Sequence, residues 1–375
     1  MRPPGRIPGI RRIPGRLRPV EPNTVLFDSW RGKYADNPRA VSEELHRRDP
    51  SYRQIWVLEK DDPLLPGYVE TVDPCSWNHL AWLGRAQYVV SNGGMPIYWR
   101  KKRGQFYLQT WHGSPLKKLA YDIEQPQWAR AGRYLRHFRR DVRGWDMLLS
   151  QSSFASDVQR GCFRYGGRIL ESGYPRNDLL LSADAERVRA ETRARLGLDD
   201  GVRVVLYAPT WRDTWTFDLD LDLGAVADAL GPDTVFLLRA HNHVAKTVVT
   251  EPHPRVMDVS RIPDPRELLL AADVMVADYS SIIFDFALTR RPILFFTHDL
   301  EHYRDELRGM YIDLEADAPG PLLRTTPELV DALRELDGGG VPAGHRERYE
   351  RFLEQHTEFD DGRASERAVE AVFGV

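Results

Sequence analysis

Short apolar segments alternate along this 375-residue chain with charged segments of helical pattern, and this alternation constrains the fold more than any other feature. In the first half, the expected strands cover residues 24–27, 54–58, 88–90, 106–109, 147–149 and 168–170. In the second half, they cover residues 204–207, 235–238, 274–276 and 293–296. Strands that alternate with helices predict an α/β fold with parallel sheets.

The chain is long for one domain and sufficient for two, each with its own core. A charged helical segment at 184–196, closed by Gly197, separates the two groups of strands. We therefore predict two α/β domains that face each other across a cleft, the first at 21–183 and the second at 184–345. Residues 346–375 have a helical pattern, and we expect them to return to the first domain.

Composition excludes several classes of protein. With 42% hydrophobic and 29% charged residues, the chain is typical of soluble globular proteins. A formal net charge of −3 argues against a general nucleic-acid binder. Cys75 and Cys162 form no metal-ligand or Cys-x-x-Cys spacing, so a reducing cytoplasm is expected. The sequence contains no apolar run of the roughly 18 residues that a membrane-spanning helix needs.

Basic segments concentrate in the first half. Residues 1–20 alternate arginine with proline and glycine, which indicates a flexible tail, either simply disordered or a strap at an anionic membrane. Residues 128–145 interleave cationic and aromatic side chains, which indicates either a solvated charged face or a helix at a membrane interface. One helical stripe of this segment carries Arg130, Arg133, His137 and Arg140. Because a third basic run lies at 101–103, we favour peripheral attachment to an anionic membrane surface.

The segment 109–117, Gln-Thr-Trp-His-Gly-Ser-Pro-Leu-Lys, follows an expected strand. Gly113 allows close backbone approach or a positive φ. Pro115 suits the first turn of a helix, with Ser114 as its N-cap. His112 would then lie at a strand-to-helix turn, where it can act as a general base near neutral pH. The alternative is a capped turn with an incidental buried histidine.

A second polar segment, 238–243, also leaves a strand. If the chain stays extended, Arg239, His241 and His243 lie on one side and suit a phosphoryl oxygen. A His-x-His metal site is the rival interpretation, but no motif supplies further ligands. We therefore expect no metal.

In the third segment, 277–285, a strand ends and a helix begins near Ser281. The hydroxyls of Ser280 and Ser281 would gather at the positive end of that helix, which favours an anion. Asp285, one helical turn further, could accept hydrogen bonds from ribose hydroxyls. The alternative is a serine N-cap followed by an ordinary buried helix.

Two loops complete the candidate site. In the loop 207–213, Thr210 and Arg212 could contact a donor substrate, or the loop is a rigid turn with a surface arginine. The turn 171–178 contains Asn177 and is either an interdomain turn or an edge of the substrate site.

Taken together, the segments 109–117, 173–178, 207–212 and 278–285 resemble the CDP-glycerol glycerophosphotransferase family, whose members build teichoic acids and related capsule polymers. They occur in the family's order, and the resemblance spans about residues 25–368. It implies a GT-B fold of two Rossmann-like domains, with the acceptor domain first and the nucleotide domain second. It also implies transfer without a metal, a cofactor or a covalent enzyme intermediate.

The resemblance assigns residues to roles. His112 would match the family's proposed base and His241 its second important histidine, while Ser280, Ser281 and Asp285 would match the nucleotide-side motif. Ser114 stands where many members have threonine, which preserves the hydroxyl. We expect Gly113, Ser114 and Asn177 to support the acceptor or its turn.

The expected reaction is attack of an acceptor hydroxyl on the β-phosphorus of a CDP-polyol, most simply CDP-glycerol, with release of CMP. His112 would take the proton, Arg239 and His241 would stabilise the phosphoryl oxygens, and the acceptor would be a lipid-linked saccharide or a polyol phosphate. The expected location is the cytoplasmic face of the membrane. Alternatives are a GT-B nucleotide-sugar glycosyltransferase or epimerase, and a non-catalytic binding protein of the same fold.

Overall fold

The computed structural model describes residues 18–59, 65–124, 131–199, 201–210, 221–240, 253–336 and 340–375. Contacts divide the chain into two compact units, each assembled from separate stretches of sequence. Unit 1 comprises Met1–His112, Gly132–Asp178 and Phe359–Val375, and unit 2 comprises Gly113–Ala131 and Leu179–Glu358. The predicted domain limits, 21–183 and 184–345, stay a prediction, because these units are defined by contacts and not by independent folding.

Unit 1 is built on a seven-stranded sheet of order β3-β2-β1-β4-β5-β6-β7, and every pairing in it is parallel. Its strands are β1 (Glu21–Asp28), β2 (Arg53–Val57), β3 (Val69–Val72), β4 (Ala86–Ser91), β5 (Phe106–Gln109), β6 (Met147–Ser150) and β7 (Arg168–Glu171). The six predicted strands are confirmed, and β3 is the one the sequence analysis missed. It lies at the sheet edge with two exposed residues, so it lacks an apolar run.

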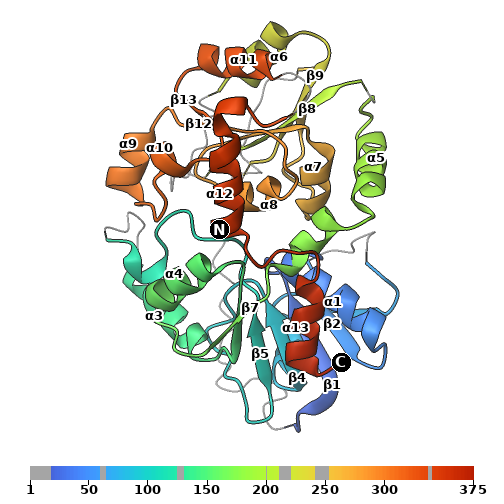
Figure 1. Cartoon of the computed structure of the whole chain (residues 1–375). Helices are drawn as coiled ribbons and strands as arrows, with labels where there is room; N and C mark the ends of the chain where they lie inside the picture. Colours follow the sequence, from blue (N-terminus) through green and yellow to red (C-terminus); the bar gives the residue numbers. More distant parts are fainter. Residues whose placement is uncertain are drawn as a thin grey trace. The chain divides into compact units, whose positions relative to one another are not determined.

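The helices of unit 1 cover this sheet and close its core. They are α1 (Asp36–Arg48), α2 (Trp77–Leu83), α3 (Ala131–Val142), α4 (Ser153–Phe163) and α13 (Ala364–Phe373), with the 3₁₀ helix η2 (Pro175–Leu181) at the boundary between the units. Helices α1 and α13 lie side by side (Figure 1). Val369 and Phe373 of α13 join Phe27 and Trp56 of the sheet in one buried cluster, so the last helix is part of the core of unit 1.

Unit 2 contains a six-stranded parallel sheet of order β10-β9-β8-β11-β12-β13. Its strands are β8 (Arg203–Ala208), β9 (Thr234–Leu238), β10 (Val256–Asp258), β11 (Val274–Ala277), β12 (Ile293–Phe296) and β13 (Leu322–Leu323). The four predicted strands are confirmed. The sequence analysis missed β10 and β13, which at three and two residues are too short to show a pattern.

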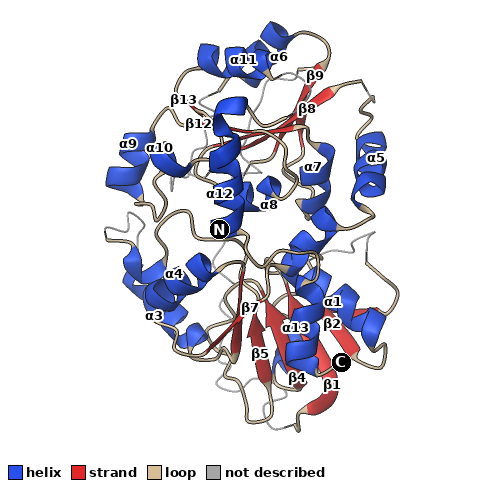
Figure 2. Ribbon diagram, in the orientation of Figure 1, coloured by secondary structure: helices blue, strands red, loops and turns tan. Residues whose placement is uncertain are grey.

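Helices lie around the strands of unit 2 (Figure 2). They are α5 (Ala185–Arg195), α6 (Leu223–Leu230), α7 (Arg266–Ala271), α8 (Ile282–Ala287), α9 (Leu300–His302), α10 (Leu314–Asp317), α11 (Thr326–Glu335) and α12 (Arg346–His356). Three short non-α helices complete the unit: η1 (Ala120–Asp122), the π-helix η3 (Tyr303–Leu307) and η4 (Ala343–His345). Two parallel sheets with intervening helices confirm the predicted α/β class. Within the described ranges, no helix is both long and apolar enough to cross a bilayer.

The parallel register brings several strand ends of unit 1 to one edge. Asp28, the last residue of β1, pairs with Ser91 of β4, which in turn pairs with Gln109 of β5. The loops that follow these strands therefore leave the sheet at the same level. Asn92 and His112 lie in two of these loops, at the carboxyl edge where parallel sheets place their ligand sites.

The prediction that a helix begins at Ser114 is wrong. Lys117 instead forms an antiparallel bridge with Met310, and the backbone N–H of Tyr311 donates to the carbonyl of Leu116 at 2.9 Å. The backbone groups that a helix would use are therefore satisfied by another segment of unit 2. A capping signal of serine and proline cannot report such a distant partner.

Candidate functional site

His112 is held in one orientation by a backbone carbonyl. Its Nδ1 lies 2.6 Å from the carbonyl oxygen of Asn92. Because a carbonyl can only accept, Nδ1 carries the proton, and Nε2 of the neutral ring keeps a free lone pair. Burial lowers the pKa of His112, while the Asn92 carbonyl and the Asp36 carboxylate oppose this shift and Arg176 adds to it. The ring is therefore neutral near pH 7, as a general base must be.

Two indole rings fix the plane of this imidazole. Trp111 stacks on it with ring centroids 4.3 Å apart and planes 26° apart, and Trp30 lies against it at 4.8 Å. The backbone N–H of Trp30 also donates to the side-chain oxygen of Asn92, at 3.0 Å. The group that orients His112 is thus itself anchored.

A buried amide supports the backbone on which His112 stands. The Nδ2 group of Asn37 donates to the carbonyls of Thr110 and Trp111, at 3.2 and 3.1 Å. Its Oδ1 accepts from the backbone N–H of Arg176 at 3.0 Å. Asn37 is fully buried, so this one side chain ties the His112 loop to the turn at residue 176.

A buried ion pair completes this support. Arg176 Nη1 donates to Asp36 Oδ1 at 3.0 Å, and only 5% and 2% of the two side chains are exposed. The indole N–H of Trp30 donates to the other oxygen of Asp36 at 2.8 Å. Sequence reasoning missed Trp30, Asp36 and Asn37 as site residues, and the polar Asp-Asn-Pro start of α1 was the available signal.

The backbone around His112 adopts a conformation that side chains disfavour. Trp30, Arg31, Asp36 and Trp111 have φ values of 50°, 58°, 64° and 53°, in the left-handed region. Each such residue costs about 1–2 kcal/mol. Four of the nine non-glycine residues with positive φ in the described chain thus lie in segments that meet at His112, which indicates a conformation imposed by its surroundings.

The other predicted residues near His112 are buried. Gly113 has a φ of 150°, which agrees with the expected need for glycine, and Ser114 is 2% exposed. Asn177 is 1% exposed, and its Nδ2 donates to Asp360 at 3.3 Å. Asp360 also accepts from the backbone N–H of Tyr174 at 2.8 Å, so Asn177 lies within a braced turn of unit 1.

In unit 2, a buried carboxylate joins two of the predicted segments. Both oxygens of Asp278 accept from the backbone N–H of Thr210, at 2.9 and 3.0 Å. One of them also accepts from the N–H of Tyr279 at 2.6 Å. Because β8 and β11 are paired up to Ala208 and Ala277, the Thr210 loop and the Ser280–Ser281 turn leave the sheet together. Asp278 therefore fixes their spacing.

Helix α8 begins at Ile282, which confirms the predicted helix start near Ser281. Ser281 occupies the N-cap position without a side-chain capping hydrogen bond. Ser280 and Ser281 are partly buried, whereas Asp285 is 2% exposed.

The predicted phosphate ligand Arg239 follows β9, and its guanidinium donates to the carbonyls of Ile262 and Pro263, at 2.7 and 3.4 Å.

Sequence reasoning missed a contact between Lys117 and Tyr303, which in turn stacks on Tyr279. Lys117 Nζ donates to the hydroxyl of Tyr303 at 3.3 Å, and the Tyr303 ring stacks on Tyr279 with centroids 4.2 Å apart. The Tyr279 hydroxyl donates to Asp299 at 2.8 Å. Tyr303 therefore links the end of the first predicted segment to the start of the third inside unit 2.

Several predicted residues lie outside the described part of the chain, namely Arg212, His241 and His243. Within the described part, no group of three His, Cys, Asp or Glu side chains is arranged to hold a metal ion.

Comparison with known proteins identifies the family. A family model described as CDP-Glycerol:Poly(glycerophosphate) glycerophosphotransferase matches residues 14–374. The chain belongs to this family. The predicted family is thereby confirmed, and with it the predicted class of enzyme, a glycerophosphotransferase.

Curated relatives of this glycerophosphotransferase family member act in teichoic acid synthesis. The teichoic acid poly(glycerol phosphate) polymerase of Bacillus subtilis (strain 168) is 37% identical over 95% of this chain and 49% of its own length. Its namesake from Bacillus spizizenii is 35% identical over 97% of this chain and 95% of its own. The teichoic acid glycerol-phosphate transferase of Staphylococcus aureus is 34% identical over 94% of this chain and 93% of its own length. The chain thus spans about half of the first relative and nearly all of the other two.

Solved structures confirm the fold. The wall teichoic acid polymerase TagF matches with a TM-score of 0.87 and 34% identity, over 95% of this chain and 89% of the other. A His-to-Asn variant of TagF soaked with CDPG matches equally well. The UDP-GlcNAc 2-epimerase of Methanocaldococcus jannaschii matches with a TM-score of 0.53 at 11% identity, which shows a shared fold alone. The predicted GT-B class is confirmed by the match to TagF.

Proposed function

We propose that this chain transfers glycerol phosphate from CDP-glycerol to an acceptor hydroxyl and releases CMP, as a step of teichoic acid synthesis. The observation that carries the proposal is the fixed, neutral imidazole of His112 in a chain that matches a glycerophosphotransferase family over residues 14–374. Relatives named as glycerol-phosphate polymerases and transferases support it, as does a TagF structure soaked with CDPG.

In the proposed reaction, the acceptor oxygen attacks the β-phosphorus of CDP-glycerol. A bond forms between these two atoms, and the bond from phosphorus to the bridging oxygen breaks with its electrons going to CMP. His112 Nε2 accepts the hydroxyl proton and later returns it to water. The Asn92 carbonyl, at 2.6 Å from Nδ1, holds the ring so that Nε2 is the basic nitrogen. A positioned base of this kind typically accelerates a reaction about 10²- to 10⁴-fold.

We assign the donor nucleotide to unit 2. Ser280 and Ser281 would donate hydrogen bonds to a phosphate, and Thr210 would lie beside them because Asp278 fixes its loop. Arg239, Arg212 and His241 would stabilise charge on the phosphoryl oxygens, at roughly 3 kcal/mol per donor. Asp285 would bind the ribose. No metal or other cofactor is needed for this step, so we expect turnover to persist in EDTA.

We assign the acceptor, a lipid-linked saccharide or a polyol phosphate, to unit 1, and we propose that α3 attaches this unit to the inner face of the cell membrane. Exposed arginines on and just after α3 support this assignment: Arg133, Arg136, Arg139 and Arg143. Tyr134 is 44% exposed, whereas Phe138 packs on Trp111 and Phe163 within the unit. Each cation near an anionic surface contributes about 1 kcal/mol.

The pH dependence of transfer follows from the lowered pKa of His112. The ring loses its function as a base only when it is protonated, so kcat/KM should be constant near pH 7 and fall on the acid side. We expect the apparent pKa of that fall to lie below 6.5, the ordinary value for imidazole. CMP release measured from pH 5 to 9 checks this, and an acid limb centred above 6.5 would contradict it.

Mass spectrometry of the products tests the proposal as a whole. Purified protein, CDP-glycerol and a lipid-linked disaccharide should give CMP and an acceptor heavier by glycerol phosphate units. CDP-ribitol serves as the comparison donor, because one relative is a ribitol-phosphate primase at 29% identity. Release of UDP from nucleotide sugars, without any transfer from CDP-glycerol, would favour a glycosyltransferase or an epimerase instead.

A further inference from the structure

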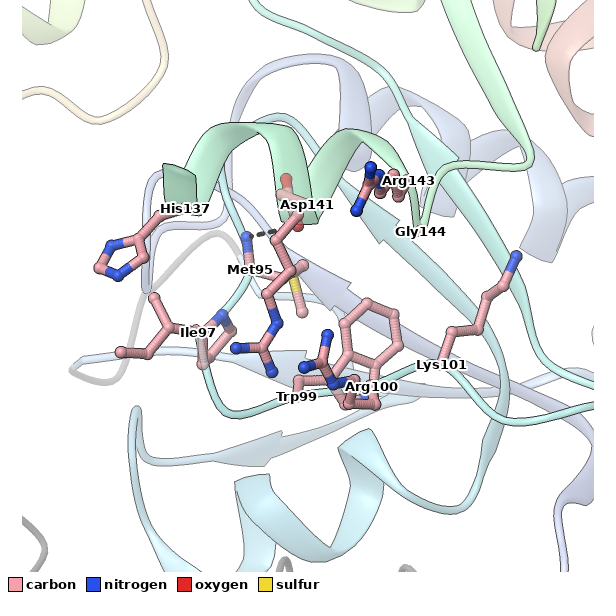
Figure 3. A pocket seen from close by; sticks show the side chains of 11 residues that line it. Met95, Ile97, Trp99, Arg100, Lys101, His137, Asp141, Arg143 and Gly144 are labelled. Atoms are coloured by element: carbon pink, nitrogen blue, oxygen red, sulfur yellow. Dashed lines mark hydrogen bonds between the residues drawn. The ribbon is translucent and has the colours of Figure 1, made fainter. Parts of the chain in front are cut away.

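A cationic pocket of about 250 Å³ lies in unit 1 between α3 and the segment that follows β4 (Figure 3). Met95, Ile97 and Trp99 form part of its wall, and Ile97 is 50% exposed at the rim. Five side chains that carry or can carry positive charge line it: Arg100, Lys101, His137, Arg140 and Arg143. The proposed transfer step uses none of them.

In the described part of the chain, the arginines of this pocket have no counter-ions. Among the described residues, no carboxylate forms an ion pair with Arg100, Arg140 or Arg143. Nε of Arg140 is buried without a hydrogen-bond partner. Burial, and then the nearby charge of Arg100, lower the pKa of Arg140, so the two guanidinium groups repel each other. An anion between them would remove this repulsion and supply the missing acceptors.

The carboxyl group of Asp141, which also lines the pocket, is hydrogen-bonded to other protein groups. Its oxygens accept from the backbone N–H of Met95 at 3.3 Å and from the indole N–H of Trp145 at 3.1 Å. Figure 3 shows the contact to Met95. Burial raises the pKa of Asp141 to about 7, so much of it is protonated near neutral pH and opposes a bound anion less. Lys101 differs from the arginines, because it is paired with Asp146.

One wall of the pocket follows the loop that orients His112. Asn92 accepts the hydrogen bond from His112, and Met95 forms the pocket wall. Two residues lie between them, so their Cα atoms are three steps along the chain, or at most about 11 Å, apart. The wall of the pocket thus begins within this distance of the residue that orients His112.

We infer that this pocket binds a phosphodiester of the acceptor, within its chain of glycerol phosphate units. Arg100 and Arg140 would hold its two non-bridging oxygens through charge-assisted hydrogen bonds, with His137 and Arg143 at the rim. The inference rests on the proposed function for the identity of the ligand. A phospholipid head group carries the same phosphodiester and is the rival source.

Binding of a lipid-free probe tests this assignment. The probe is a synthetic oligomer of three glycerol phosphate units with a fluorescent end group, titrated with the full chain in an anisotropy assay. We expect the variant Arg100→Gln/Arg140→Gln to bind it about 100-fold more weakly, at about tenfold for each lost charge-assisted contact. The matched control is Arg133→Gln/Arg136→Gln, which removes two exposed charges outside the pocket and should change the affinity less than about threefold.

Vesicles of phosphatidylglycerol or phosphatidylcholine distinguish an acceptor phosphodiester from a phospholipid head group as the ligand of the pocket. The control variant should lose cosedimentation with the anionic vesicles. The pocket variant should mainly lose affinity for the glycerol phosphate oligomer. Equal oligomer affinity in the pocket variant and the wild type, or equal losses in both variants, would overturn the inference. Loss of vesicle binding in the pocket variant alone would assign the pocket to a lipid head group instead.

Two further readouts keep the test interpretable. The Tm of the pocket variant should equal or exceed that of the wild type, because the substitutions relieve the repulsion between Arg100 and Arg140. His112→Ala should bind the oligomer normally, since the assay involves no transfer. Absence of transfer by the wild-type protein would refute the proposed function, while the oligomer titration would still decide whether the pocket binds phosphodiesters.

Discussion

Substitution of His112 by alanine is expected to lower the rate of CMP release from CDP-glycerol by a factor of about 10² to 10⁴. The imidazole is neutral, its Nδ1 proton is bound to the Asn92 carbonyl, and its Nε2 lone pair is available to the acceptor hydroxyl. Alanine removes the base and leaves the donor residues of unit 2 unchanged. Single-turnover measurement of CMP release, at saturating acceptor, reports this loss directly.

The matched control is His302→Ala, at an exposed histidine of α9 that pairs with Glu306. We expect it to keep the wild-type rate. Both variants should show the wild-type circular dichroism spectrum and bind CDP-glycerol with unchanged affinity. Near-normal turnover by a folded His112→Ala protein would remove His112 from the mechanism.

Replacement of Arg176 by methionine is expected to destabilise the protein by about 3–5 kcal/mol, because it leaves the Asp36 carboxylate buried without its partner charge. The same change should lower activity, since Asp36 also holds the indole of Trp30, which lies against His112. Urea denaturation of the variant and the wild type gives the free energy of unfolding.

The double variant Asp36→Asn/Arg176→Met should recover part of this loss, because it removes the uncompensated charge as well. Arg187→Met is the control: Arg187 pairs with Asp184 and Glu191 at the surface, and its loss should cost less than about 1 kcal/mol. A double variant no more stable than Arg176→Met would show that the buried charge is not the cause.

The strands that the sequence predicted are those with a continuous apolar run. Residues 147–149 and 293–296 are fully buried in the sheets, so their composition alone indicated strands. Edge strand β3 has two consecutive exposed residues, and β13 pairs over two residues only, so neither has a local signal. Their pairing depends on the neighbouring strand and not on their own composition.

The site was predictable where a single segment carries it, and not where distant segments combine. His112, Thr210 and Ser281 follow strands and could be picked out in sequence. The support of His112 by Asn37 and Arg176 joins residues 139 positions apart, and no local pattern encodes such a pairing. For the same reason, the bridge from Lys117 to Met310 replaced the helix expected at Ser114.

The position of α13 also determines the order in which the protein can fold during synthesis. The strands of unit 1 lie within residues 21–171, but Val369 and Phe373 complete their buried cluster. The amino-terminal sheet therefore leaves the ribosome with part of its apolar surface uncovered, and it stays so while all of unit 2 is translated. Since such exposed surface favours aggregation, unit 1 is expected to be prone to aggregation until α13 emerges.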